Sequence, residues 1–106
     1  MIRAMAYLGL STPAVDGWRS FGRDILGLQL LDDGPDGAAR FRMDEADCRL
    51  WVHPGEQHDL AYIGWALASE ADALALKARI EAAGPQLTRA EPAEAEARRV
   101  AGFLWF

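Results

Sequence analysis

The pentapeptide Ala6-Tyr7-Leu8-Gly9-Leu10 recurs fifty-five positions later as Ala61-Tyr62-Ile63-Gly64-Trp65. Both copies are short, largely apolar segments of the kind that form β-strands. A second anchor, Gly27-Leu28-Gln29-Leu30, recurs at nearly the same offset as Gly84-Pro85-Gln86-Leu87. Two anchors repeated in the same order predict that the chain contains one structural unit twice.

One amphipathic helix is predicted between the anchors of each copy. In the first copy four apolar residues recur at spacings that place them on one helical face: Trp18, Phe21, Ile25 and Leu28. The second copy repeats the same spacing with Ala73, Leu76, Ile80 and Ala83. The agreement supports an equivalent helix in both copies.

Start and stop signals flank both predicted helices. The first helix is expected to begin near Ser11 or Thr12, with Pro13 in its first turn. Before the second helix, Ser69 and Asp72 have the spacing of a capping box. Both helices are expected to end at a glycine, because glycine tolerates the left-handed conformation that is common just past a helix. These glycines are Gly27 and Gly84.

Two half-buried strands are predicted after the first helix, because the apolar pattern changes there to period two. The inward positions are expected to be Ala39, Phe41 and Met43 in one strand and Cys48, Leu50 and Val52 in the next. The alternating outward positions are Arg40 and Arg42, then Arg49, Trp51 and His53. Residues 32–37 and 44–47 are rich in turn-forming or acidic residues and are predicted to be turns.

Each copy is therefore predicted to be a βαβββ module, the first at residues 1–54 and the second, truncated, at residues 59–106. In the second copy residues 91–98 read as an inserted helical turn, which leaves too little chain for the final strand. The apolar run Phe103-Leu104-Trp105-Phe106 would then adjoin an unpaired sheet edge. We expect an α+β fold, a half-open mixed-sheet barrel with that final strand missing, either because the chain is a fragment or because a partner supplies the strand.

Composition limits the possible partners. The 106 residues are 51% hydrophobic and 25% charged, which is typical of one globular domain. Sixteen acidic against eleven basic residues give a formal charge of −5, which disfavours nucleic acid. Apolar stretches fall far short of the roughly 20 residues that cross a bilayer, so no membrane partner is expected. The single cysteine and the lack of a leader predict a cytoplasmic protein.

Several residues with chemical potential are interpreted as structural. His53 and His58 flank a polar connector in which side chains are ordinarily solvated, and their spacing fits no common metal motif. Cys48 occupies an inward strand position and is interpreted as a packed thiol instead of a nucleophile. Tyr7 and Tyr62 could line a ligand cavity, but packing inside a barrel is favoured.

Arg98 and Arg99 could bind a carboxylate ligand, although pairing with nearby glutamates is the simpler account. Phosphate-binding glycine loops, catalytic carboxylate pairs and Ser/His/Asp arrangements are not evident in the sequence. We therefore assign no catalytic, cofactor-binding or metal-binding residue in this chain.

The order and spacing of short segments resemble the vicinal oxygen chelate superfamily, which has the glyoxalase/bleomycin resistance/dioxygenase fold. Within it, the resemblance is to the N-terminal domain of type I extradiol dioxygenases of the 2,3-dihydroxybiphenyl or catechol type, and it covers residues 2–106. The segments that carry the resemblance are Tyr7-Leu8-Gly9, Trp18-Arg19-Ser20-Phe21 running into Leu26-Gly27-Leu28, Asp59-Leu60-Ala61-Tyr62, and Arg98-Arg99-Val100-Ala101-Gly102.

The resemblance implies a non-catalytic domain of an iron(II)-dependent ring-cleavage enzyme that acts on catechols. In that family two histidines and a glutamate of a second barrel hold the iron, and the first barrel supports structure and subunit contacts. The corresponding histidine positions here fall at or beside Tyr7 and Tyr62, which are poor iron(II) ligands. The expected partners are the chain's own C-terminal catalytic barrel or a second copy of the chain, within a homo-oligomer.

Two alternatives remain open within the same superfamily. One is a stand-alone small-molecule binding protein of the antibiotic-sequestering type, in which two chains pair to form a cleft. The other is a glyoxalase-like metalloenzyme, which would need metal ligands where this chain has tyrosine. In all three interpretations the fold is the same.

Overall fold

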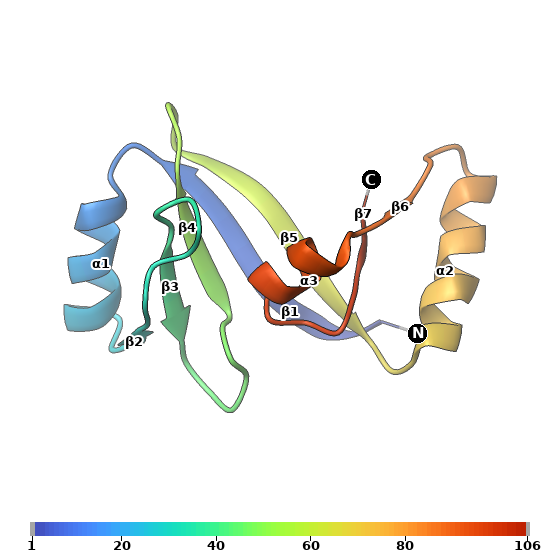
Figure 1. The fold of residues 1–106 in the computed structure, drawn as a ribbon, viewed down its shortest axis with the longest axis horizontal. Helices are drawn as coiled ribbons and strands as arrows, with labels where there is room; N and C mark the ends of the chain where they lie inside the picture. The colour runs from blue at the N-terminus through green and yellow to red at the C-terminus, as the bar shows by residue number, and fades with distance from the viewer. Residues whose placement is uncertain (1, 106) are drawn as a thin grey trace. The chain divides into compact units, whose positions relative to one another are not determined.

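The computed structural model describes residues 2–105. Its elements follow in the order β1 (Ile2–Thr12), α1 (Val15–Asp24), β2 (Gln29–Leu30), β3 (Ala39–Arg42), β4 (Leu50–Pro54), β5 (Asp59–Leu67), α2 (Glu70–Ala82), β6 (Thr88–Arg89), α3 (Pro92–Ala97) and β7 (Leu104–Trp105) (Figure 1). This order confirms the predicted tandem of βαβββ modules. Within residues 2–105 the second module has two strands after its long helix, whereas the first module has three.

Five strands form one mixed sheet in the order β2-β3-β4-β1-β5. β1 and β4 are parallel, with Leu8 opposite Leu50 and Leu10 opposite Val52. A parallel pair needs a crossover, and α1 with the β2–β3 hairpin provides it. β3 is antiparallel to both β2 and β4. The arrangement places α1 beside the β2, β3 and β4 side of the sheet (Figure 1).

Contacts divide the chain into two compact units. The first comprises residues 5–64 and contains α1 with most of the five-stranded sheet. The second combines the residues up to Ala4 with those from Trp65 onward, and contains both α2 and α3. Among residues 2–105, no helix is long and apolar enough to span a bilayer.

The hydrophobic core of residues 5–64 lies between α1 and the sheet. It is formed by buried residues of β3 and β4, namely Ala39, Phe41, Leu50 and Val52. Phe41 and Val52 are fully buried, and removing each such side chain from water contributes about 1.5–3 kcal/mol. Partly buried residues of β1, α1 and β2 complete the cluster: Leu8, Leu10, Val15, Trp18, Leu28 and Leu30.

Helix α1 begins later than the sequence predicts. β1 continues to Thr12, because the parallel ladder with β4 pairs Thr12 with Pro54. The N-cap is Ala14, which makes no side-chain capping bond. Pro13 therefore precedes the helix and does not lie in its first turn. The pairing with β4, which local sequence does not reveal, sets the boundary.

The predicted apolar face of α1 is only partly buried. Trp18 and Leu28 pack against the core, as expected, whereas Phe21 is 42% and Ile25 is 72% exposed. Ile25 is already the C-cap, so it lies past the last helical turn and leaves the face that contacts the sheet. Gly27 has a φ of 71°, which confirms the predicted left-handed residue after the helix.

β3 and β4 are covered on both faces, which corrects the prediction of half-buried strands. Arg40 and Trp51 were expected on the solvent side, yet they are 8% and 2% exposed. They lie opposite one another in the antiparallel ladder. Met43 was expected inside but is 55% exposed, because β3 ends one residue earlier. Cys48 is buried, and its thiol donates to the carbonyl oxygen of Phe41, as a packed thiol should.

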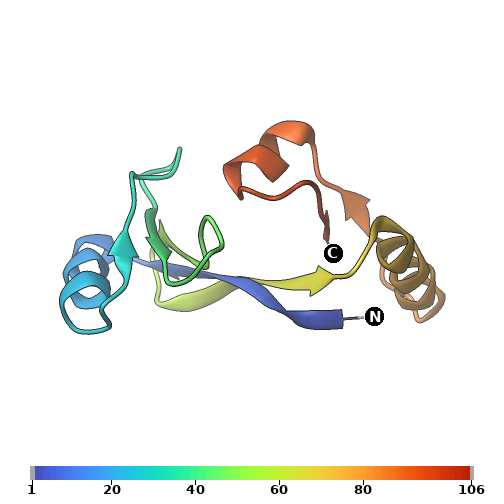
Figure 2. The same cartoon turned by 90° about the horizontal axis from the view of Figure 1, so that it is seen from below.

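The second unit follows the predicted signals closely. Ser69 is the N-cap of α2, and its side chain accepts a hydrogen bond from the backbone N–H of Asp72 at 3.1 Å. The helix ends just before Gly84, whose φ is 128°. The predicted inserted turn is helix α3, which Figure 2 shows in the connection between β6 and β7. β6 and β7 pair antiparallel, with Thr88 opposite Trp105.

The repeated pentapeptides meet in the sheet, where β1 and β5 are neighbours that run in opposite directions (Figure 1). The ring of Tyr62 lies directly over Gly9, and the ring of Tyr7 lies directly over Gly64. A Cβ atom at either glycine would overlap the ring of the other copy's tyrosine. Each repeat therefore supplies one aromatic ring and one bare backbone position to the other.

We predict that Gly9→Ala destabilises the fold by about 1–3 kcal/mol, because the added methyl group must displace the packed Tyr62 ring. The measurement is the free energy of unfolding from urea denaturation followed by circular dichroism. Gly102→Ala is the matched control: that position has open space around it, so a change within about 0.5 kcal/mol is expected. Equal effects of the two substitutions would contradict the close packing.

We also predict that Ser69→Ala lowers the free energy of unfolding by about 1 kcal/mol, because a backbone N–H in the first turn of α2 loses its acceptor. Ser20→Ala makes the same chemical change at an exposed position inside α1 and should shift stability by less than about 0.5 kcal/mol. Urea denaturation of both variants checks the difference. A Ser69→Ala variant as stable as the parent chain would show that the cap does not contribute.

Candidate functional site

A cluster of aromatic rings occupies the sheet face opposite α1, within residues 5–64. Leu8, Leu50 and Val52 point toward the helix, so alternation along the strands sends Tyr7 and Trp51 to the other face. Tyr7 packs edge-on against Trp51, with ring centroids 5.6 Å apart, and also against Tyr62, at 5.9 Å. We call Tyr7, Trp51 and Tyr62 the aromatic row.

His53 connects this row to the turn between β2 and β3. Its Nδ1 lies 2.7 Å from a carboxylate oxygen of Asp36, and its Nε2 lies 2.6 Å from the hydroxyl oxygen of Tyr62. A carboxylate can only accept, so the proton on Nδ1 is assigned by this partner. In the neutral imidazole Nε2 then accepts a hydrogen bond from the Tyr62 hydroxyl. The result is a series of two hydrogen bonds that runs from Asp36 through His53 to Tyr62.

The surroundings of Asp36 favour the ionised form of its carboxyl group. Burial alone would raise the pKa of its carboxyl group. The hydrogen bond with His53, the hydrogen bond from the backbone N–H of Ala38 and the electrostatic attraction of His53 outweigh that effect, so the pKa of Asp36 lies below its ordinary value. Asp36 is therefore a carboxylate near neutral pH and can orient His53. The side chains of His53 and Asp36 are 24% and 49% exposed, so the pair is partly screened by solvent.

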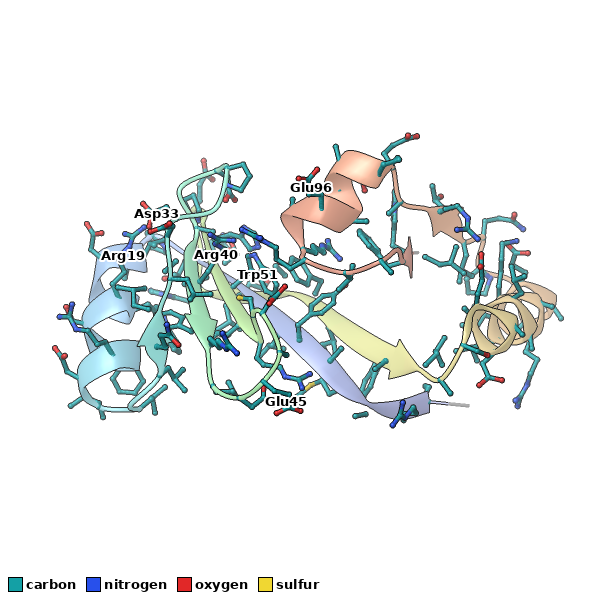
Figure 3. The ribbon with its side chains drawn as sticks, turned by 60° about the horizontal axis from the view of Figure 1, so that its bottom comes forward. Arg19, Asp33, Arg40, Glu45, Trp51 and Glu96 are labelled. Carbon is teal, nitrogen blue, oxygen red and sulfur yellow. The ribbon has the colours of Figure 1, made fainter. Side chains whose placement is uncertain are left out.

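Two arginines hold the turn that carries Asp36. The guanidinium of Arg19, from α1, donates to Asp33 and to the carbonyl oxygen of Gly37, both at 2.9 Å. Arg40, from β3, donates from Nε to the carbonyl oxygen of Asp32 at 2.7 Å. Figure 3 shows Arg19 pointing toward Asp33, with Arg40 and Trp51 on neighbouring strands.

The two histidines differ from the interpretation as a solvated connector. His53 lies in β4, as the alternating pattern predicted, but both its ring nitrogens are hydrogen-bonded to side chains, so the interpretation as a solvated side chain is wrong for His53. His58 is exposed, as expected, but its Nδ1 lies 2.7 Å from the hydroxyl oxygen of buried Thr12. That hydroxyl also accepts the backbone N–H of Ala14. Sequence reasoning missed Asp36, because a turn rich in Asp, Gly and Pro does not indicate which carboxylate faces the sheet.

The donors at the aromatic row do not fit an iron(II) ion. The histidine positions implied by the family resemblance are held by phenols, which are weak iron(II) ligands compared with imidazole. The ring of Tyr7 packs over Gly64, and the hydroxyl of Tyr62 is engaged with His53. Within residues 2–105, no group of three or more His, Cys, Asp or Glu side chains is placed to hold a metal ion.

The remaining candidate residues lie in the second unit or on α1. The guanidinium of Arg98 lies 4.3 Å from the centre of the Phe103 ring, a cation–π contact within the segment after α3. The backbone of Arg99 has a φ of 58°, and its N–H donates to the carbonyl oxygen of Glu96. A shallow apolar hollow of about 320 Å³ lies on α1, lined by Ala14, Gly17, Trp18 and Phe21.

Comparison with known proteins gives one consistent result. Residues 5–55 match the family model described as "Dihydroxybiphenyl dioxygenase BphC D1". The biphenyl-2,3-diol 1,2-dioxygenase of Sphingomonas paucimobilis is 38% identical over 101 residues, which is 95% of this chain and 34% of that protein. The chain thus spans about a third of the length of the curated relatives that it matches.

Solved structures agree with the sequence relatives. The crystal structure of BphC, a halotolerant catechol dioxygenase, superposes with a TM-score of 0.98 at 66% identity, over 100% of this chain and 36% of that one. The Mn(II)-bound glyoxalase from Novosphingobium aromaticivorans shares the fold, with a TM-score of 0.73 at 24% identity, over 84% of this chain and 30% of that one. Over nearly its whole length the chain is therefore similar to extradiol dioxygenases, and the family model that matches residues 5–55 is named for a first domain.

Proposed function

We propose that this chain is the non-catalytic N-terminal domain of an iron(II)-dependent extradiol dioxygenase that opens catechol-type rings. The observation that carries the proposal is the extent of the similarity. Almost the whole chain aligns with ring-cleaving dioxygenases, yet it spans about a third of their length. The family model that it matches is named for a first domain.

The chemistry of the residues supports the non-catalytic assignment. The reaction needs a metal with open positions for the catechol oxygens and dioxygen. The aromatic row offers two phenols at the corresponding positions, and both rings are packed over glycine backbone. We assign no catalytic, cofactor-binding or metal-binding residue here. The proposal assigns iron(II) to a second barrel of the parent enzyme.

The partners follow from the same proposal. This domain would pack against the catalytic barrel of its own polypeptide and meet other copies in a homo-oligomer. The catechol substrate would reach the protein through the catalytic barrel, in the cytoplasm. The acidic balance of the chain, with a formal charge of −5, supports the exclusion of nucleic acid from this set.

The domain organisation is also part of the proposal: two modules, at residues 1–54 and 59–106. The repeated order of strand and helix supports this division. The compact units are divided differently: residues 59–64 of β5 are grouped with residues 5–58, and the residues up to Ala4 are grouped with those from Trp65 onward.

We predict that the chain, loaded anaerobically with iron(II) and desalted, retains iron far below one atom per chain. It should show no oxygen uptake with 2,3-dihydroxybiphenyl, because the ligands for iron lie elsewhere in the parent enzyme. Iron assay and an oxygen electrode are the measurements. The full-length biphenyl-2,3-diol dioxygenase of Sphingomonas paucimobilis, treated identically, is the positive control.

Stoichiometric iron together with turnover would overturn the non-catalytic assignment. The natural reading frame gives an independent check, since the proposal requires a continuation past Phe106 that carries two histidines and a glutamate. A dimer of the chain that binds aromatic ligands saturably, encoded by a frame without that continuation, would favour a stand-alone binding protein instead.

A further inference from the structure

The hydrogen-bonded chain from Asp36 to Tyr62 has a use that the proposed function does not require. The hydroxyl oxygen of Tyr62 lies 2.6 Å from Nε2 of His53, and Nδ1 of the same imidazole lies 2.7 Å from a carboxylate oxygen of Asp36. A base within hydrogen-bond reach of an O–H group, itself oriented by a third group, is the arrangement that moves a proton on demand. Here the group that would release the proton is a tyrosine.

We propose that Tyr62 is a proton-coupled redox site, oxidised by one electron while His53 takes its phenolic proton. The reaction needs a one-electron oxidant from outside the chain. The oxidant gains one electron, the O–H bond of Tyr62 breaks, and an N–H bond forms at Nε2 of His53. The products are a neutral tyrosyl radical and an imidazolium ion. A one-electron reductant reverses both transfers.

The surroundings of His53 stabilise the product side. The imidazolium carries a full positive charge, and Asp36 at 2.7 Å from Nδ1 is a carboxylate that offsets it. The turn that bears Asp36 is held by Arg19 and Arg40, so the carboxylate is already in place before the proton moves. Asp36 acts through His53 and is a positioning residue.

The aromatic row provides a route for the electron. Trp51 is 2% exposed and touches Tyr7 edge-on, and Tyr7 touches Tyr62 in the same way. The centroid separations of 5.6 and 5.9 Å place the three rings in direct contact. An oxidising equivalent that enters at one ring can pass along the row, and the 2.6 Å contact with His53 makes Tyr62 its end point.

The experiment uses the 106-residue chain with flash-generated tris(bipyridine)ruthenium(III) as the oxidant. Transient absorption gives the rate of tyrosyl radical formation, and electron paramagnetic resonance identifies the radical. The chain has two tyrosines, so Tyr62→Phe and Tyr7→Phe form a matched pair. Both variants keep the ring that lies over a glycine. We expect Tyr62→Phe to lose most of the tyrosyl signal and Tyr7→Phe to retain it.

His53→Gln tests the proton acceptor. Glutamine can hydrogen-bond to Tyr62 but cannot accept its proton, so we expect the rate of radical formation to fall by about a hundredfold. Radical formation should show a solvent deuterium isotope effect in the parent chain and in Asp36→Asn. We expect Asp36→Asn to slow radical formation less than His53→Gln does. Circular dichroism and urea denaturation are used to check that each variant is folded.

A tyrosyl signal that survives in Tyr62→Phe would overturn the proposal, as would a His53→Gln variant that is oxidised at the parent rate. If His53→Gln does not fold, the isotope effect in the parent chain decides, and its absence would contradict proton transfer to His53. These measurements do not involve ring cleavage, so they test the redox site independently of the proposed function.

Discussion

The architecture depends on the reciprocal seating of two tyrosines on two glycines. Tyr7 lies over Gly64 and Tyr62 lies over Gly9, so β1 and β5 can adjoin only where one strand presents a ring and the other presents bare backbone. Protein interiors are packed densely enough that one extra methyl group at such a contact must displace its neighbours. The contact also fixes where the Tyr62 hydroxyl lies, and hence which residue His53 can reach.

The two faces of β4 have different roles within residues 5–64. Toward α1, Leu50 and Val52 contribute apolar area to the core. Toward the other face, Trp51 and His53 meet aromatic and polar partners, where hydrogen bonds and ring geometry specify the arrangement. If β4 were buried on one face alone, the imidazole of His53 would be hydrated. Water would form hydrogen bonds with its ring nitrogens but would not fix the orientation of the ring.

The aromatic row differs from a metal site in the groups that it brings together. A metal site needs several anionic or imidazole donors that converge on one point. Here the converging groups are phenol and indole rings, which fill space and contact one another edge to edge. The same interior positions support packing and, as we propose, the movement of one proton and one electron.

The repeated pentapeptide, the helix stop signals and the Ser69 cap are local features, and the sequence by itself determined them, together with the tandem module order and the resemblance to extradiol dioxygenases. Local sequence could not set the start of α1 or the burial of Trp51, because pairing with other strands decides them. Only the tertiary structure brought Asp36, His53 and Tyr62 together. Their contacts join a turn and two strands, and no periodicity or spacing in the sequence predicts that these three side chains meet.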